Sequence, residues 1–131
     1  PEALRLREVA DIDADELIVT PDMRTRKAEM DRRADAFLVL PGGLGTLEEL
    51  LEIWVSRSLA MHDKAVVVLD PDGVFAPLRE QAEALVRDGF APRAAVDVTV
   101  WTTDVAAAFD ALEAPGPARV PTAEDVLEAE P

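Results

Sequence analysis

Apolar and polar positions along the chain form blocks that predict strands and helices in alternation. Apolar runs of five residues stand at 36–40 and 65–69, a length typical of strands buried in a parallel sheet. Between them, residues 47–60 carry apolar side chains three or four positions apart, which predicts a helix with a buried face through Leu47, Leu50, Leu51 and Trp54. The other predicted elements are a short strand or extended entry at 17–20, a strand at 98–101 and helices at 22–33, 74–88 and 103–112.

The order of these elements predicts the fold class. Strands that alternate with helices indicate an α/β protein with a Rossmann-like parallel sheet flanked by helices, and such proteins bind ligands at the carboxyl ends of the strands. We expect residues 1–112 to form the C-terminal portion of a single nucleotide-binding domain of this type. Residues 113–131 hold four prolines and five acidic residues, which predicts a flexible acidic extension.

A glycine-rich turn lies between the apolar run at 36–40 and the helix at 47–60. Its glycines permit backbone conformations closed to other residues and leave the main chain open to a ligand. With Thr46 as the N-cap, the N–H groups at the start of the helix favour an anion such as a phosphate. The turn matches neither the Walker A pattern nor Gly-x-Gly-x-x-Gly, and tight packing of strand on helix is the alternative explanation. The predicted phosphate loop is Gly42, Gly43, Leu44, Gly45 and Thr46.

Two further sets of charged residues are candidates for function. Glu49 follows the loop, although with Thr46 it also fits a capping box, in which its carboxylate bonds back to the start of the helix. On the helix at 22–33, Met23 and Met30 fall on one stripe that we expect to be buried, flanked by Arg26 and Lys27. Cations beside a buried face need an anion nearby, whereas a solvated basic face is the alternative and our expectation for Arg24, Arg32 and Arg33.

These residues carry a family resemblance. Met23-x-x-Arg26-Lys27-x-x-Met30, followed by Pro41-Gly42-Gly43-x-Gly45-Thr46-x-x-Glu49, resembles the paired signature of the Lonely Guy family. Its members are cytokinin riboside 5′-monophosphate phosphoribohydrolases, formerly described as possible lysine decarboxylases. The similarity covers roughly residues 5–90 and continues through 50–54, 62–64 and 66–69.

The resemblance implies hydrolysis of the N-glycosidic bond of N6-substituted adenosine 5′-monophosphates, with release of the free base and ribose 5-phosphate. It implies a catalytic pair, Arg26 and Glu49, without a cofactor. It also implies that Lys27 and Glu8 bind substrate and that the glycine loop holds the phosphate. The sequence departs from the family pattern at Val55, Ser56 and Ala65, and we expect these departures to bear on base specificity.

Composition excludes some alternatives. The 131 residues include no cysteine and a single histidine, so we expect no disulfide, no thiol nucleophile and no metal centre. His62 could protonate the departing base, but we expect it to anchor a loop by a hydrogen bond. A net charge of −14 argues against a DNA-binding relative of this fold, and five cations against two acids at 24–33 suffice for one phosphate only. A non-catalytic carrier of a phosphorylated nucleotide or cofactor stays open, though it would not need Arg26 paired with Glu49.

The resemblance also predicts the setting of the site. Relatives carry an N-terminal nucleotide-binding half, so we expect further strands and part of the base pocket to precede residue 1. They are homodimers or higher assemblies, and the apolar helix at 47–60 is our candidate for the subunit contact. No signal peptide is visible, and the cytoplasm is the expected compartment.

Overall fold

The computed structural model describes residue 1 and residues 13–114, which belong to two units, Pro1–Ala34 and Asp35–Pro131. The first contains helix α1 (Met23–Arg33). Asp22 is its N-cap, and the Asp22 carboxylate accepts a 2.7 Å hydrogen bond from the Thr25 N–H, which lowers the pKa of Asp22. The predicted helix at 22–33 is therefore confirmed.

Residues 17–20, predicted as a short strand or an extended entry, lie in no strand of the described part of the chain. A further expectation for this unit is wrong. The stripe of α1 expected to be buried is exposed, with Met23 and Met30 at 39% and 47% of their full exposure. The described residues of this unit bury no apolar side chain, so nothing in it covers the stripe.

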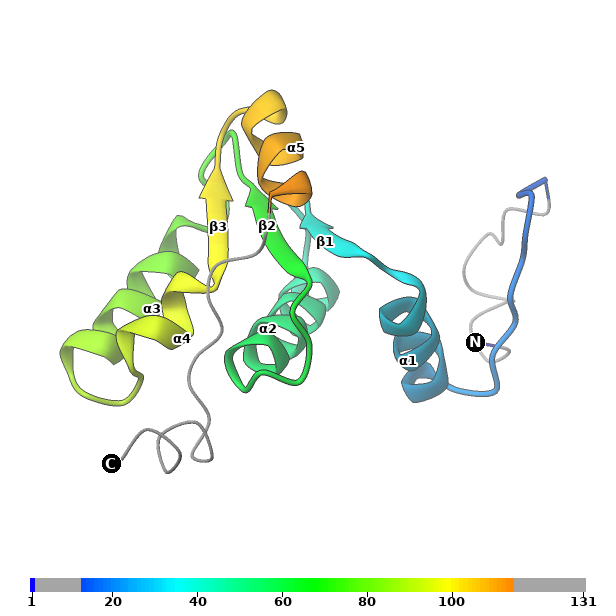
Figure 1. The fold of residues 1–131 in the computed structure, drawn as a ribbon, viewed down its shortest axis with the longest axis horizontal. Helices are drawn as coiled ribbons and strands as arrows, with labels where there is room; N and C mark the ends of the chain where they lie inside the picture. Colours follow the sequence, from blue (N-terminus) through cyan, green and yellow to red (C-terminus); the bar gives the residue numbers. More distant parts are fainter. Residues whose placement is uncertain (2–12, 115–131) are drawn as a thin grey trace, which may run out of the picture. The chain divides into compact units, whose positions relative to one another are not determined.

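The second unit is a parallel α/β sheet, as expected. Its strands lie in the order β1 (Ala36–Val39), β2 (Ala65–Leu69) and β3 (Thr99–Thr102), and all three point the same way (Figure 1). In the register, Val39 pairs with Val68 and Leu69 with Thr102, so the strands end level with one another. The helices that flank this sheet within residues 35–114 are α2 (Leu44–Ser58), α3 (Ala76–Arg87), α4 (Arg93–Asp97) and α5 (Val105–Glu113).

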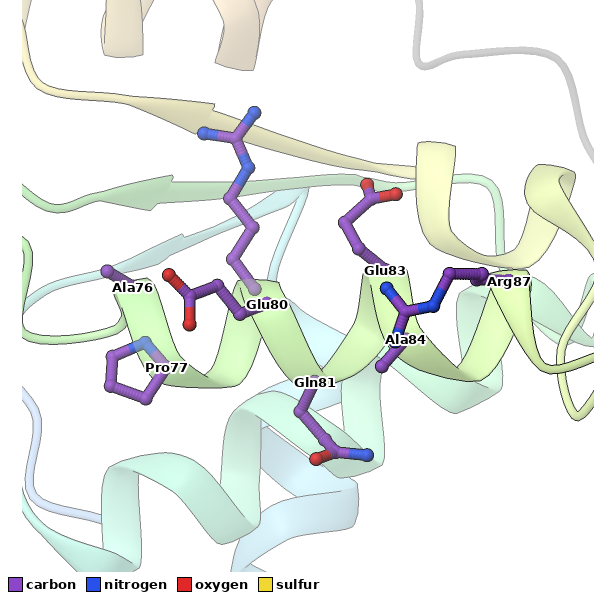
Figure 2. A pocket seen from close by; sticks show the side chains of 8 residues that line it. Ala76, Pro77, Glu80, Gln81, Glu83, Ala84 and Arg87 are labelled. Atoms are coloured by element: carbon purple, nitrogen blue, oxygen red, sulfur yellow. The ribbon is translucent and has the colours of Figure 1, made fainter.

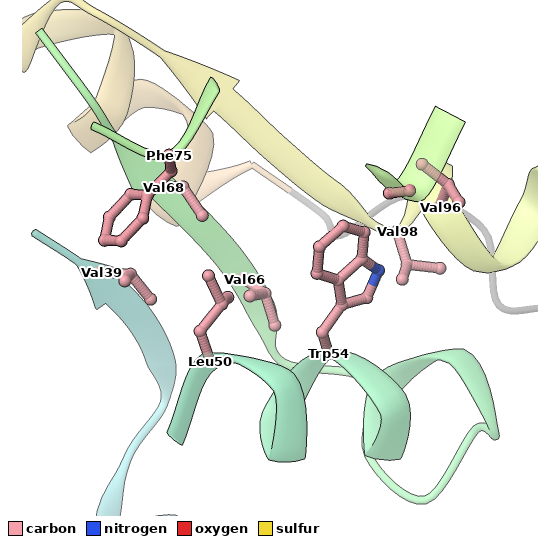
Figure 3. Close-up of a cluster of buried hydrophobic side chains, with 9 residues drawn as sticks. Val39, Leu50, Trp54, Val66, Val68, Phe75, Val96 and Val98 are labelled. Atoms are coloured by element: carbon pink, nitrogen blue, oxygen red, sulfur yellow. The ribbon is translucent and has the colours of Figure 1, made fainter. Parts of the chain in front are cut away.

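Helices cover both faces of the central strand, and every residue of β2 is buried. Val66 and Val68 point into a cluster with side chains of α2, α3 and α4, which Figure 3 shows around Leu50 and Trp54. The alternate residues of β2 face α5, where Ala108 is fully buried. This burial on both sides explains why the strand has no polar residue.

The element boundaries differ from the predicted ones where local chemistry is unusual. Helix α2 begins three residues earlier than predicted, because Gly43 and not Thr46 is the N-cap. The five-residue α4 was not predicted; it follows Pro92 and is held by a 2.8 Å hydrogen bond from the Trp54 indole N–H to the Ala95 carbonyl. Leu51 is 44% exposed and does not share the buried face of Leu50 and Trp54.

No helix in the described ranges is long and apolar enough to cross a membrane.

Candidate functional site

The carboxyl edge of the sheet is where neighbouring loops meet. Residues 40–43 leave β1 and residues 70–75 leave β2 at this edge, on strands that lie about 4.8 Å apart. The Asp70 N–H also donates a 2.8 Å hydrogen bond to the Thr102 carbonyl, which ties the second loop to β3. This arrangement is the ordinary ligand-binding edge of an open parallel sheet.

The glycine loop leads directly into α2. Gly43 has an extended backbone, with φ −91° and ψ −156°, and the Leu47 N–H closes the first helical turn on the Gly43 carbonyl at 3.1 Å. Gly43 has no side chain to cap the helix, and the first turn holds no acidic residue. The expectation that Thr46 caps the helix is wrong, because Thr46 already lies within the first turn.

The glycines of the loop are needed for space and not for unusual backbone angles. Left-handed φ values occur among the described glycines at Gly73 and Gly89, so the expectation of special conformations in the loop is wrong. A Cβ on Gly42 would overlap the Thr46 side chain, whereas a Cβ on Gly43 or Gly45 would meet no atom within 4 Å. Gly42 therefore serves packing, and the other two leave the backbone at the start of α2 open to a ligand.

Glu49 lies in the second turn of α2, one residue before the fully buried Leu50. Its side chain is half-buried, whereas the neighbouring Glu48 is exposed. The capping-box explanation for Glu49 is wrong, because that motif requires Thr46 as the N-cap. The structure thus brings the open glycine loop and a half-buried carboxylate together on one strand-to-helix junction.

Arg26 and Lys27 lie side by side in sequence on α1 and are both half-buried. They belong to the first unit, and the glycine loop and Glu49 belong to the second. Glu8 lies outside the described residues.

Two further basic residues of α1, Arg32 and Arg33, form ion pairs on its surface. Arg32 pairs with Glu29 at 2.6 Å, and Arg33 pairs with Glu16 at 2.8 Å and with Glu29 at 3.0 Å. The hydrogen bonds from these guanidinium groups lower the pKa of Glu29 and Glu16. Arg32 and Arg33 are therefore engaged with carboxylates of their own unit, as expected for a solvated basic face.

One residue at the carboxyl edge was missed by sequence reasoning. The carboxylate of Asp70 accepts two hydrogen bonds of 2.8 Å, from the N–H groups of Val74 and Phe75. The signal was present in the Asp70-Pro71-Asp72-Gly73 turn, since an aspartate at the start of a turn commonly bonds to the backbone that follows.

An open hollow along α3 is a poor alternative site. All its lining side chains come from this one helix, and Figure 2 shows Gln81 and Glu83 pointing to opposite sides of it. Glu83 is already paired with Arg93 at 2.6 Å. The lining side chains therefore do not converge on a common ligand.

His62 anchors a loop, as expected. Its Nε2 lies 3.2 Å from the Ile53 carbonyl oxygen, an acceptor, so this nitrogen carries the proton. The residue stands before β2, at the sheet edge opposite the glycine loop. The described residues contain no group of three His, Asp or Glu side chains that could hold a metal ion.

Known proteins resemble this chain over most of its length. A family profile described as "Possible lysine decarboxylase" matches residues 1–112. Cytokinin riboside 5′-monophosphate phosphoribohydrolases of Mycobacterium marinum and Mycobacterium tuberculosis are 47% and 46% identical to it over 117 residues, 89% of this chain. One from Arabidopsis thaliana is 44% identical over 90 residues, 69% of this chain and 42% of its own length. The chain spans 61% of the length of each mycobacterial relative.

Proposed function

The chain belongs to the family described as possible lysine decarboxylases, and since its two mycobacterial relatives are named phosphoribohydrolases, we propose that it acts on nucleoside 5′-monophosphates. The reaction is hydrolysis of the N-glycosidic bond, with N6-substituted adenosine 5′-monophosphates as the preferred substrates. Its products are the free base and ribose 5-phosphate.

One observation carries this proposal: an open glycine junction stands directly before a half-buried carboxylate. Gly43 and Gly45 leave the start of α2 accessible, and the N-terminal end of a helix attracts a phosphate. Glu49 lies one turn further along the same helix. A nucleotide bound by its 5′-phosphate would therefore place its ribose within reach of this carboxylate.

The chemistry requires such a carboxylate. As the bond from C1′ to the base nitrogen breaks, positive charge develops on the ribose, and an anion beside C1′ stabilises it. Glu49 can also accept a proton from the water whose oxygen bonds to C1′, while the departing base nitrogen takes up a proton from solvent. In this proposal Arg26 and Lys27 supply the cations that offset the phosphate charge, a task that suits the planar guanidinium of Arg26.

The test is release of free base from N6-isopentenyladenosine 5′-monophosphate, with AMP and the unphosphorylated riboside measured in parallel. We expect release to require the 5′-phosphate and to fall by a hundredfold or more in Arg26→Ala and in Glu49→Gln, on the scale of lost electrostatic groups in closed sites. Glu48→Gln, at the exposed neighbouring position, is the matched control. Tight nucleotide binding without base release would instead favour the carrier function.

We also propose that the protein is a homodimer that associates through α2. Leu51, Val55 and Leu59 follow one another at helical spacing on its outer face and are 44%, 52% and 64% exposed. A continuous exposed apolar stripe of this kind suits a self-complementary contact. In light scattering after size-exclusion chromatography, Val55→Asp should convert a dimer to a monomer, whereas Phe90→Asp, at an exposed position elsewhere, should not. A monomeric parent protein at micromolar concentration would contradict this contact.

A further inference from the structure

The loop between β2 and α3, residues 70–75, has no part in the reaction as proposed. It nevertheless leaves the central strand of the sheet at the same edge as the glycine loop. Neighbouring strands lie about 4.8 Å apart, so the two loops are adjacent. A substrate held by the glycine loop must therefore meet or pass this second loop.

Asp70 holds the second loop in a fixed form. Its two carboxylate oxygens accept 2.8 Å hydrogen bonds from consecutive N–H groups, those of Val74 and Phe75. Gly73, with φ +72°, makes the turn that allows this return. The loop thus supplies its own anion to the N–H groups leading into α3, and a substrate phosphate is not needed there.

The two residues bound by Asp70 point to different surroundings. Phe75 is 2% exposed and belongs to the core cluster that also contains Val39 and Leu50 (Figure 3). Val39 ends β1 just before the glycine loop, and Leu50 follows Glu49, so Phe75 shares its core cluster with residues next to both ends of the proposed phosphate site. Val74, by contrast, is 53% exposed and presents an apolar side chain at the edge.

We propose that this loop is the second wall of the nucleotide site, with Asp70 as its positioning residue and Val74 as an apolar contact for the base. The inference rests on the proposed function. A nucleotide has a charged phosphate at one end and a flat, largely apolar base at the other. The glycine loop suits the phosphate. The exposed Val74, in a loop whose N–H groups are already bonded to Asp70, suits the base or its N6 substituent.

Steady-state kinetics on the whole protein tests the assignment. Val74→Thr keeps the shape of an exposed side chain and should raise KM for N6-isopentenyladenosine 5′-monophosphate about fourfold, the loss expected for one buried methyl group. Inhibition by ribose 5-phosphate, which has the phosphate and sugar but no base, should not change. Asp70→Ala should raise the same KM further, and Asp70→Asn, which keeps one acceptor oxygen, should recover part of the loss. Asp110→Asn is the control, because Asp110 is an exposed aspartate of α5 and lies outside both loops.

The outcomes separate this inference from the proposed function. Normal KM values in Val74→Thr and Asp70→Ala, with an active parent protein, would overturn the second wall alone. Equal weakening of ribose 5-phosphate and nucleotide in Val74→Thr would overturn the contact with the base. A parent protein that releases no base from any nucleotide would overturn the proposed function itself, and the inference with it.

Discussion

The β1–α2 and β2–α3 junctions occupy equivalent places in the fold, but only the second has a carboxylate of the chain bonded to its backbone N–H groups. Both join a parallel strand to a helix at the carboxyl edge of the sheet. At β2–α3 the chain supplies a carboxylate, since Asp70 bonds to two N–H groups. At β1–α2 the N-cap is Gly43, which has no side chain, and the space around it is open. The same backbone unit thus serves as a structural joint in one place and is suited to bind a ligand in the other.

Helices α1 and α5 follow the closed pattern, whereas α4, which follows Pro92, has no side-chain cap. Asp22 caps α1 through the Thr25 N–H at 2.7 Å, and Asp104 caps α5 through the Ala107 N–H at 2.8 Å. An aspartate cap typically contributes about 1 kcal/mol to stability. Gly43, at the start of α2, has no side chain and makes no such contribution. In the proposed complex the nucleotide phosphate would bind where a capping side chain otherwise lies.

The strongest test converts the open junction into a closed one. Gly43 already has the extended backbone of an N-cap, so Gly43→Asp should fold normally and gain a few tenths of a kcal/mol. Its carboxylate would occupy the proposed phosphate position, and a like charge about 4 Å away costs about 4 kcal/mol at an effective dielectric constant of 20. We expect kcat/KM for base release to fall a hundredfold or more, and less in the neutral Gly43→Asn. Full activity in Gly43→Asp would place the phosphate elsewhere.

Within the glycine loop, two alanine substitutions should have opposite effects on stability. Gly42→Ala places a Cβ against the Thr46 side chain and should destabilise the fold by about 1–3 kcal/mol. Gly45→Ala lies in the helix with open space around it and should stabilise the fold by up to about 1 kcal/mol. Urea unfolding measures both. Adding Thr46→Ala removes the hydroxyl and methyl groups but keeps the Cβ, so it should restore part of the stability lost in Gly42→Ala. No recovery at all would mean that the overlap with the Thr46 hydroxyl and methyl groups is not the cause.

At the closed junction, removal of the carboxylate should cost stability in proportion to the hydrogen bonds lost. Asp70→Ala leaves the N–H groups of Val74 and the buried Phe75 without their acceptors and should lower the free energy of unfolding by about 1–2 kcal/mol. Asp104→Ala, which removes a single exposed cap bond, should cost about 1 kcal/mol or less. Equal effects in urea unfolding would mean that the second bond of Asp70 contributes nothing.

The contrast between the junctions also shows what the sequence could predict. The strand Ala65–Leu69 and the helix at 22–33 were found almost residue for residue, because apolar runs and aspartate caps are local signals. The start of α2 was missed, since Thr46 is a better cap by propensity than Gly43 and only the short connection to β1 decides between them. The exposure of Met23 and Met30 was missed because burial depends on partners that a helical pattern does not specify.

In the candidate site, the glycine loop and Glu49 were predicted from sequence motifs, but the structure gives these residues different structural roles from the predicted ones. The glycines serve space and packing, and Glu49 lost its explanation as a cap when the helix proved to begin earlier. Asp70 was passed over because its importance lies in the topology: only the parallel pairing of β1 with β2 brings its loop beside the glycine loop.

A third connection, between α3 and α4, is bridged by the exposed ion pair of Arg93 with Glu83. Removing this pair should change stability least among these predictions, and the change should depend most on pH. Hydrogen bonds from Arg93 lower the pKa of Glu83, so the folded state binds fewer protons than the unfolded state near this pKa. Its contribution is therefore complete above about pH 4.3, the ordinary pKa of a glutamate, and is lost as the pH falls further. Thermal melts from pH 6 to pH 3 should show a shallower fall of Tm in Arg93→Gln than in the parent protein, with Arg87→Gln as the control. Parallel curves would mean that this solvent-exposed pair, unlike the hydrogen bonds accepted by Asp70, leaves stability unchanged.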